Sequence, residues 1–320
     1  MSHDCYNFHD VSLEICGDES AVLAGIRSRL KLFLQPELKA TDIRFEIRLV
    51  PDPRAHVVEK PNGPSRHVYD PPIGEVVYYD AEDKLYIEYR DAVRVLCDLP
   101  AGHVSVSALQ SEARGWLLTH PMFTLPFIEF LKRRARYSVH AAGLSIDGRG
   151  VLLPGNSGSG KTTLSIVLLR AGFDFLGDDM MFLKDTDKGL RVLAFPDELD
   201  VTDETAMFFP ELHGLLHQTT RATKRSVRPE DIYETKFAWE CDPKVLIFPE
   251  VATNAKSKID AMDKDAAFLE LVPNVLLTEK PASQRHLDAL SSLVKKCECY
   301  RFSSGREFEA IPSMIREIVR

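Results

Sequence analysis

The segment from Gly155 to Thr162 constrains this chain more than any other, because it reads G-N-S-G-S-G-K-T. It fits the pattern G-x-x-x-x-G-K-[ST], which is typical of a loop that holds phosphate groups. The apolar run at 150–154 predicts a strand before the loop, and the run at 162–171 predicts a helix after it. A strand, a glycine-rich loop and a helix in this order form the context that the pattern requires.

Each residue type in the loop has a physical reason to be there. The glycines let backbone N–H groups turn toward an anion, and the helix that follows adds its positive end. Lys161 supplies positive charge for the outer phosphates, and the Thr162 hydroxyl is a ligand for Mg²⁺. Thr163 also fits an ordinary first-turn residue. We expect a bound nucleotide to contact the whole loop: Gly155, Asn156, Ser157, Gly158, Ser159, Gly160, Lys161, Thr162 and Thr163.

Two adjacent carboxylates are expected to lie beside this loop. A helix of about 11 residues rises about 16 Å, and residues 173–177 read as a strand that returns about as far. Asp178 and Asp179 follow that strand, so a βαβ unit places them next to the loop. One carboxylate there can bind Mg²⁺, and the other can accept a proton from an attacking hydroxyl. A solvated acidic turn is the alternative.

His140 is predicted to reach the same place through a hairpin. Asp147 and Gly148 lie between two apolar runs and predict a two-residue turn. With that turn the paired residue numbers sum to 295, and His140 falls opposite Gly155 to within about two residues. A histidine there can act as a base, a proton relay or a phosphate ligand. A structural histidine is the alternative.

The first 125 residues read as a separate α+β unit. A strand is expected at 11–15 and a helix at 19–34, followed by strands at 43–50, 75–80, 84–90 and 92–99. The short spacing of these last four strands favours an antiparallel meander. After Tyr137 the sequence pattern changes to closely spaced strands and helices, so we place the domain junction near 125–136. We therefore predict an α+β domain at 1–130, with a role in substrate or partner recognition, and a phosphate-binding α/β domain at 131–320.

Composition and charge exclude several function classes. The formal net charge of −8 is not that of a nucleic-acid-binding protein. No apolar run reaches the ~18 residues of a membrane span, and the first ten residues lack a signal-peptide pattern. The six cysteines are scattered, without a C-x-x-C pair, so they indicate neither zinc nor a disulfide framework. We expect a cytoplasmic protein that binds neither nucleic acid nor a membrane.

Together these motifs make 138–183 similar to the catalytic domain of HPr kinase/phosphorylase and of HPr-kinase-related kinases. The likeness lies in a histidine before a D-G hairpin, in GNSGSGKTT, and in G-D-D soon after the loop lysine. It implies an α/β fold of the HPr-kinase/phosphoenolpyruvate-carboxykinase type, with a P-loop domain preceded here by the α+β domain. It also implies transfer of the γ-phosphoryl group of ATP, with Mg²⁺, to a serine hydroxyl.

Carried over residue by residue, the resemblance gives each group a role. Lys161 and Thr162 bind ATP and Mg²⁺, Asp179 is the base, Asp178 its electrostatic and metal partner, and His140 a member of the same cluster. A weaker similarity over 223–233 implies that Lys224 reaches the phosphates, with Arg225 or Arg228 as substitutes.

The acceptor and the donor stay open at this point. The chain lacks the glycine-rich stretch that follows the catalytic core of HPr kinases, so the resemblance does not extend to HPr itself or to the phosphorylase reaction. We predict Ser or Thr of a peptide or protein as the acceptor. A small-molecule hydroxyl and an ATPase or regulator without an acceptor are the alternatives. ATP, GTP and pyrophosphate leave no distinguishing short motif, and assembly into a homo-oligomer is left open.

Overall fold

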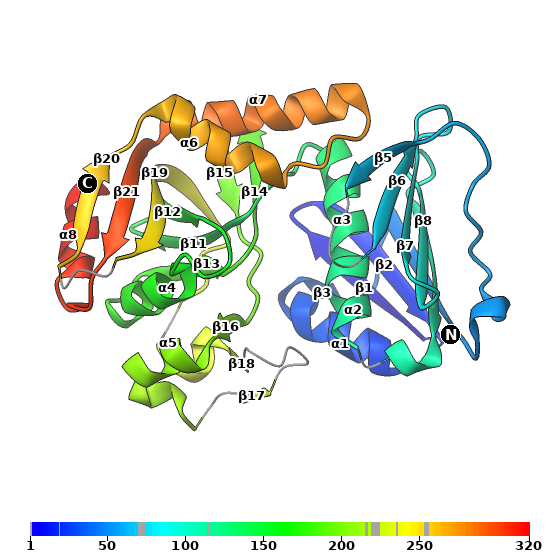
Figure 1. The fold of residues 1–320 in the computed structure, drawn as a ribbon, viewed down its shortest axis with the longest axis horizontal. Coiled ribbons are helices and arrows are strands. Elements are labelled where there is room, and N and C mark those ends of the chain that lie inside the picture. Colours follow the sequence, from blue (N-terminus) through cyan, green and yellow to red (C-terminus); the bar gives the residue numbers. More distant parts are fainter. Residues whose placement is uncertain are drawn as a thin grey trace. The chain divides into compact units, whose positions relative to one another are not determined.

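The computed structural model describes residues 2–18, 20–69, 74–113, 115–214, 217–218, 225–234, 236–252 and 256–320. It is a mixed α/β structure with several sheets (Figure 1). The chain divides into two compact units, Met1–Arg134 with Leu276–Ser283, and Ala135–Val275 with Gln284–Arg320. None of the described helices is long and apolar enough to cross a membrane. The units are not continuous stretches, unlike the domains predicted at 1–130 and 131–320, whose separate roles stay a prediction.

The first unit is built on a nine-stranded sheet of order β3-β1-β2-β4-β9-β8-β7-β6-β5. The predicted antiparallel meander is confirmed for β6, β7 and β8, and it continues into β9, which was not predicted. The prediction was wrong for β4, which pairs in parallel with both β2 and β9. Its strands and α-helices are β1 (Ser2–Phe8), β2 (Val11–Gly17), α1 (Ser20–Leu30), β3 (Leu34–Gln35), β4 (Ile43–Val50), β5 (Arg66–Tyr69), β6 (Glu75–Tyr79), β7 (Lys84–Tyr89), β8 (Val93–Asp98), β9 (His103–Leu109), α2 (Trp116–Thr119) and α3 (Pro121–Arg133).

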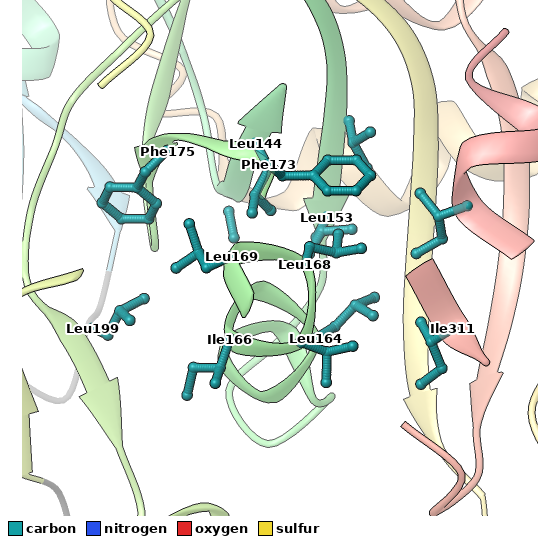
Figure 2. Packing of buried hydrophobic residues seen from close by; sticks show 14 of the residues in the cluster. Leu144, Leu153, Leu164, Ile166, Leu168, Leu169, Phe173, Phe175, Leu199 and Ile311 are labelled. Carbon is teal, nitrogen blue, oxygen red and sulfur yellow. The ribbon is translucent and has the colours of Figure 1, made fainter. Parts of the chain in front are cut away.

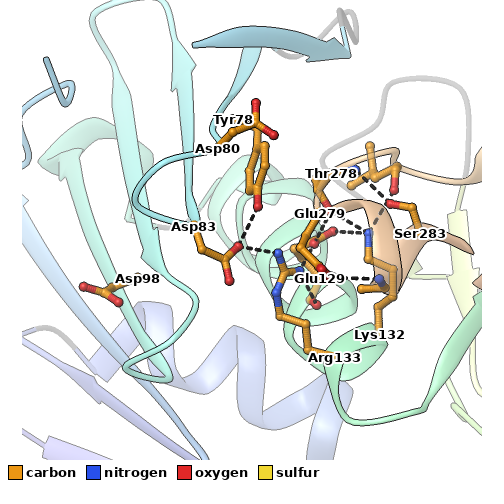
Figure 3. Close-up of polar contacts among 12 residues, drawn as sticks. Tyr78, Asp80, Asp83, Asp98, Glu129, Lys132, Arg133, Thr278, Glu279 and Ser283 are labelled. Carbon is orange, nitrogen blue, oxygen red and sulfur yellow. Dashed lines mark hydrogen bonds and ion pairs between the residues drawn. The ribbon is translucent and has the colours of Figure 1, made fainter. Parts of the chain in front are cut away.

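A buried polar cluster at the end of α3 joins the segment Leu276–Ser283 to the first unit (Figure 3). Glu129 and Lys132, which are 1% and 3% exposed, form an ion pair of 2.9 Å, and Arg133 pairs with the same carboxylate. Thr278 accepts a hydrogen bond from Lys132 Nζ at 2.7 Å and donates one to Glu129. Buried charges are costly unless they are paired and hydrogen-bonded, so Thr278 is needed to satisfy this pair.

We expect Thr278→Val to lower the free energy of unfolding by about 1–3 kcal/mol, because it leaves buried charged groups short of a hydrogen-bond partner at nearly unchanged volume. Urea denaturation followed by circular dichroism measures the loss. Thr41→Val, at an exposed position of the same unit, is the matched control and should change little. Equal stability of the two variants would show that the cluster does not need the Thr278 hydroxyl.

The second unit has a mixed sheet along the path β10-β14-β15-β19-β12-β11-β13, to which β21 and β20 add beside β19. Strands β12, β19 and β21 are parallel, so their carboxyl ends meet at one edge of the sheet. A second, small sheet has the order β16-β18-β17. The strands are β10 (Tyr137–Val139), β11 (Ala141–Ile146), β12 (Arg149–Pro154), β13 (Asp174–Gly177), β14 (Met181–Thr186), β15 (Gly189–Leu193), β16 (Leu199–Val201), β17 (His217–Gln218), β18 (Arg225–Val227), β19 (Glu240–Val251), β20 (Lys258–Ala261) and β21 (Glu298–Ser304).

Helix α4 (Lys161–Arg170) is surrounded by the core of this unit (Figure 2). Leu164, Ile166, Leu168 and Leu169 point from it in different directions, and all four are buried. An α-helix that is apolar on all sides must lie inside the fold, which fixes its first turn relative to the sheet. The remaining α-helices are α5 (Asp203–Phe208), α6 (Lys264–Leu271), α7 (Lys280–Lys296) and α8 (Ile311–Ile318).

Candidate functional site

The glycine-rich loop lies between β12 and α4, as predicted. Gly158 and Gly160 have φ angles of 86° and 98°, in the left-handed region that glycine adopts without strain. A Cβ on Gly155 would lie 2.6 Å from Ser159 Oγ, whereas one on Gly158 would meet nothing within 4 Å. The loop therefore needs glycine for its shape, and its backbone at Gly158 faces open space.

The side chain of Lys161 is folded back onto the loop. Its Nζ donates to the carbonyl oxygens of Gly155, at 2.5 Å, and of Asn156, at 3.3 Å. The buried Ser159 hydroxyl has no hydrogen-bond partner among the described residues. The positive end of α4, an ammonium group and an unused hydroxyl thus gather at one loop, which is the chemistry of an anion site.

Asp178 is held against the first turn of α4. The Thr162 hydroxyl donates to Asp178 Oδ2 at 2.9 Å, and the Asp200 N–H donates to the same oxygen at 3.4 Å. The side chain is 4% exposed, and this burial raises the pKa of Asp178 to about 7, with a further contribution from the charge of Asp179. Both hydrogen bonds act in the opposite direction.

The second oxygen of Asp178 is the feature of the site that best suits a metal ion. Oδ1 is buried and has no hydrogen-bond partner within the described ranges. A carboxylate oxygen and the Thr162 hydroxyl are hard oxygen donors, which suit Mg²⁺. The described residues contain no group of three or more His, Cys, Asp or Glu side chains placed to hold a metal. Mg²⁺ at phosphate sites takes only one or two protein ligands, so this pair of residues fits it.

His140 and Asp179 form the exposed part of the site. His140 Nδ1 lies 3.5 Å from Asp179 Oδ1, and the Asp179 side chain is 71% exposed. The predicted hairpin register is confirmed, since Ala141 pairs with Pro154 and φ is positive at both turn residues. His140 directly precedes β11 and therefore lies opposite the start of the loop.

The observed structure differs from the expected βαβ unit in one respect. Strand β13 does not pair with β12 but runs antiparallel to β11, which lies between them. The β11–β12 hairpin occupies one edge of β12, and β19 occupies the other. Strand β13 is therefore separated from β12 by β11. The Asp178 side chain nevertheless reaches the Thr162 hydroxyl.

Several features of the site have no signal in the sequence. The Thr163 hydroxyl lies 3.1 Å from that of Thr205, and Asp200 contacts Asp178 through its backbone. Both contacts come from a segment more than 20 residues away, so no local spacing indicates them.

Only some of the residues predicted to supply a second cation lie in the described part of the chain. Lys224 lies outside the described residues. Of its substitutes, Arg225 pairs with Asp203 at 2.5 Å and Arg228 with Glu198 at 3.2 Å. Both arginines are thus engaged with carboxylates.

Comparison with known proteins adds little to this geometry. No protein-family model matches the chain, and no curated protein matches it. Among solved structures, the chain is similar to the HPr(Ser) kinase/phosphatase from Coxiella burnetii, with 16% identity over 57% of this chain and 93% of that one. The TM-score is 0.29, and a likeness at that level carries no argument about activity.

Proposed function

We propose that the chain is an ATP-dependent phosphotransferase of the HPr-kinase-like type, which transfers the γ-phosphoryl group to a Ser or Thr hydroxyl of a peptide or protein. The observation that carries this proposal is the hydrogen bond between Thr162 and Asp178. It joins an anion-binding loop to a buried carboxylate with an unused oxygen, next to an exposed carboxylate. Phosphoryl transfer needs these elements together.

Each side chain has one task in this proposal. The loop N–H groups and Lys161 hold the phosphates and offset the charge that develops on the transferred group. Mg²⁺, when bound by Thr162 and Asp178, neutralises phosphate charge. Asp179 orients the acceptor hydroxyl and takes its proton, since it is exposed where an acceptor can approach. His140 holds Asp179 in place from 3.5 Å.

One lysine and one metal leave net negative charge on a nucleoside triphosphate, so a second cation is expected at the site. We assign this role to Lys224, as the resemblance implies. Arg225 and Arg228 are less suited to it, because each forms an ion pair with a carboxylate.

The test is transfer of a labelled γ-phosphoryl group from Mg-ATP into a lysate of the native host. A labelled peptide or protein that disappears with Lys161→Ala establishes the kinase, and mass spectrometry identifies its target. A labelled product of low mass shows a small-molecule acceptor. Free phosphate alone, or labelling that persists in Lys161→Ala, contradicts the proposal, and free phosphate then indicates an ATPase or regulator.

A further inference from the structure

An apolar side chain is exposed directly beside the glycine-rich loop. Val251, the last residue of β19, is 68% exposed. A Cβ placed on Gly160 would lie 3.6 Å from Val251 Cγ2, which is ordinary van der Waals contact. Val251 therefore borders the loop at Gly160, the residue that precedes α4.

Val251 and Asp178 border different residues at that helix end. The Thr162 hydroxyl, in the first turn of α4, donates to Asp178, whereas a side chain at Gly160 would meet Val251. Gly160 precedes the helix in a left-handed conformation, with φ of 98°, so the two residues face different neighbours. A ligand held by the loop with its outer phosphate near Asp178 can therefore have its other end beside Val251.

The ends of β19 and β21 place an apolar and a polar side chain together, which suits a nucleoside. Val251 is opposite Ser304, the last residue of β21, in the parallel register, so the two side chains share a face. The Ser304 hydroxyl donates to the Gly305 carbonyl at 3.3 Å, which leaves its oxygen able to accept a hydrogen bond. Ligands of open α/β sheets bind outside the carboxyl ends of the strands, where these residues lie.

We propose that Val251 and Ser304 form the nucleoside subsite of the phosphate donor. The base packs on the Val251 side chain, and Ser304 accepts a hydrogen bond from a ribose hydroxyl. The donor is then a nucleoside triphosphate and not pyrophosphate. This inference rests on the proposed function, because it takes the outer phosphate to lie beside Asp178.

The experiment compares a ligand that has a nucleoside with one that lacks it. Isothermal titration calorimetry measures the affinity of the full chain for Mg-ADP and for Mg-pyrophosphate. We expect Val251→Asn to weaken Mg-ADP by about tenfold, through loss of apolar contact, and to leave pyrophosphate within about twofold. The neutral amide adds no charge near the phosphates.

Leu269→Asn is the matched control, because Leu269 lies on α6 and is also 68% exposed. It should leave both affinities unchanged. The subsite is overturned if Val251→Asn leaves Mg-ADP unchanged, or weakens both ligands equally. If the unaltered protein binds neither ligand, or if Lys161→Ala binds both normally, the phosphate site is wrong and the proposed function falls with it.

Discussion

Replacing Asp179 by asparagine is expected to lower the rate of phosphoryl transfer by about 10²–10⁴-fold, because the amide cannot take the proton of the acceptor hydroxyl. The shape of the side chain is kept, and Asp179 is 71% exposed and lies against His140. The affinity for Mg-ADP should therefore stay within about twofold of that of the unaltered protein. Single-turnover transfer to the identified acceptor measures the rate.

Asp187→Asn serves as the control, since Asp187 is an exposed aspartate in the turn between β14 and β15. It should transfer phosphate at the normal rate. Near-normal transfer by Asp179→Asn, with normal nucleotide affinity, would falsify the assignment of Asp179 as the base. His140 or a substrate group would then have to accept the proton.

Asp178→Asn is expected to stabilise the metal-free protein at pH 8 while abolishing transfer. Burial raises the pKa of Asp178 to about 7 in the folded protein, whereas aspartate in an unfolded chain has a pKa of about 3.9. Ionising this buried carboxyl at pH 8 therefore costs up to about 4 kcal/mol. Asparagine keeps an oxygen for the Thr162 hydroxyl and carries no charge, so this cost disappears.

The sign of the pH dependence follows from the direction of this shift. Between about pH 4 and pH 7 the folded protein holds a proton on Asp178 that the unfolded chain has released. The free energy of unfolding therefore falls as the pH rises through this window, and the loss is complete above pH 7. Below about pH 4 the variant and the unaltered protein should be equally stable.

Urea denaturation in the presence of a chelator, at pH 4, 6 and 8, measures the difference between the two proteins. In a second series without the chelator, added Mg-ADP should stabilise the unaltered protein more than Asp178→Asn, because the variant has lost one metal ligand. A constant stability difference at all three pH values would show that the pKa of Asp178 is the same in the folded and unfolded chains, and would remove the argument that this carboxylate is a metal ligand.

The hairpin and the glycine-rich loop could be predicted from the sequence because each depends on the residue types within a single turn or loop. Asp147 and Gly148 adopt the positive φ angles of a two-residue turn, which sets the register from Ala141 to Pro154. The same local reasoning predicts the loop before α4 and the return of the chain to Asp178. These features lie within about 40 consecutive residues, so few alternative arrangements compete.

The order of the strands could not be predicted in the same way. Strand β13 pairs with β11 and not β12, because both edges of β12 are already taken. Strand β4 likewise pairs in parallel with β2 and β9 and stays outside the meander. Which strands pair depends on the burial of whole faces, and the pattern within one strand does not report it.

The reactive groups and their local geometry follow from the amino-acid order alone: the loop, Lys161, the two carboxylates and the hairpin that brings His140 beside them. The packed fold is needed to show which carboxylate is buried against Thr162, that Thr205 contacts Thr163, and that Thr278 hydrogen-bonds to Glu129. These features depend on burial and long-range pairing, to which many residues contribute at once. A local motif specifies donors, acceptors and turns, and the packed fold sets their environment and hence their pKa.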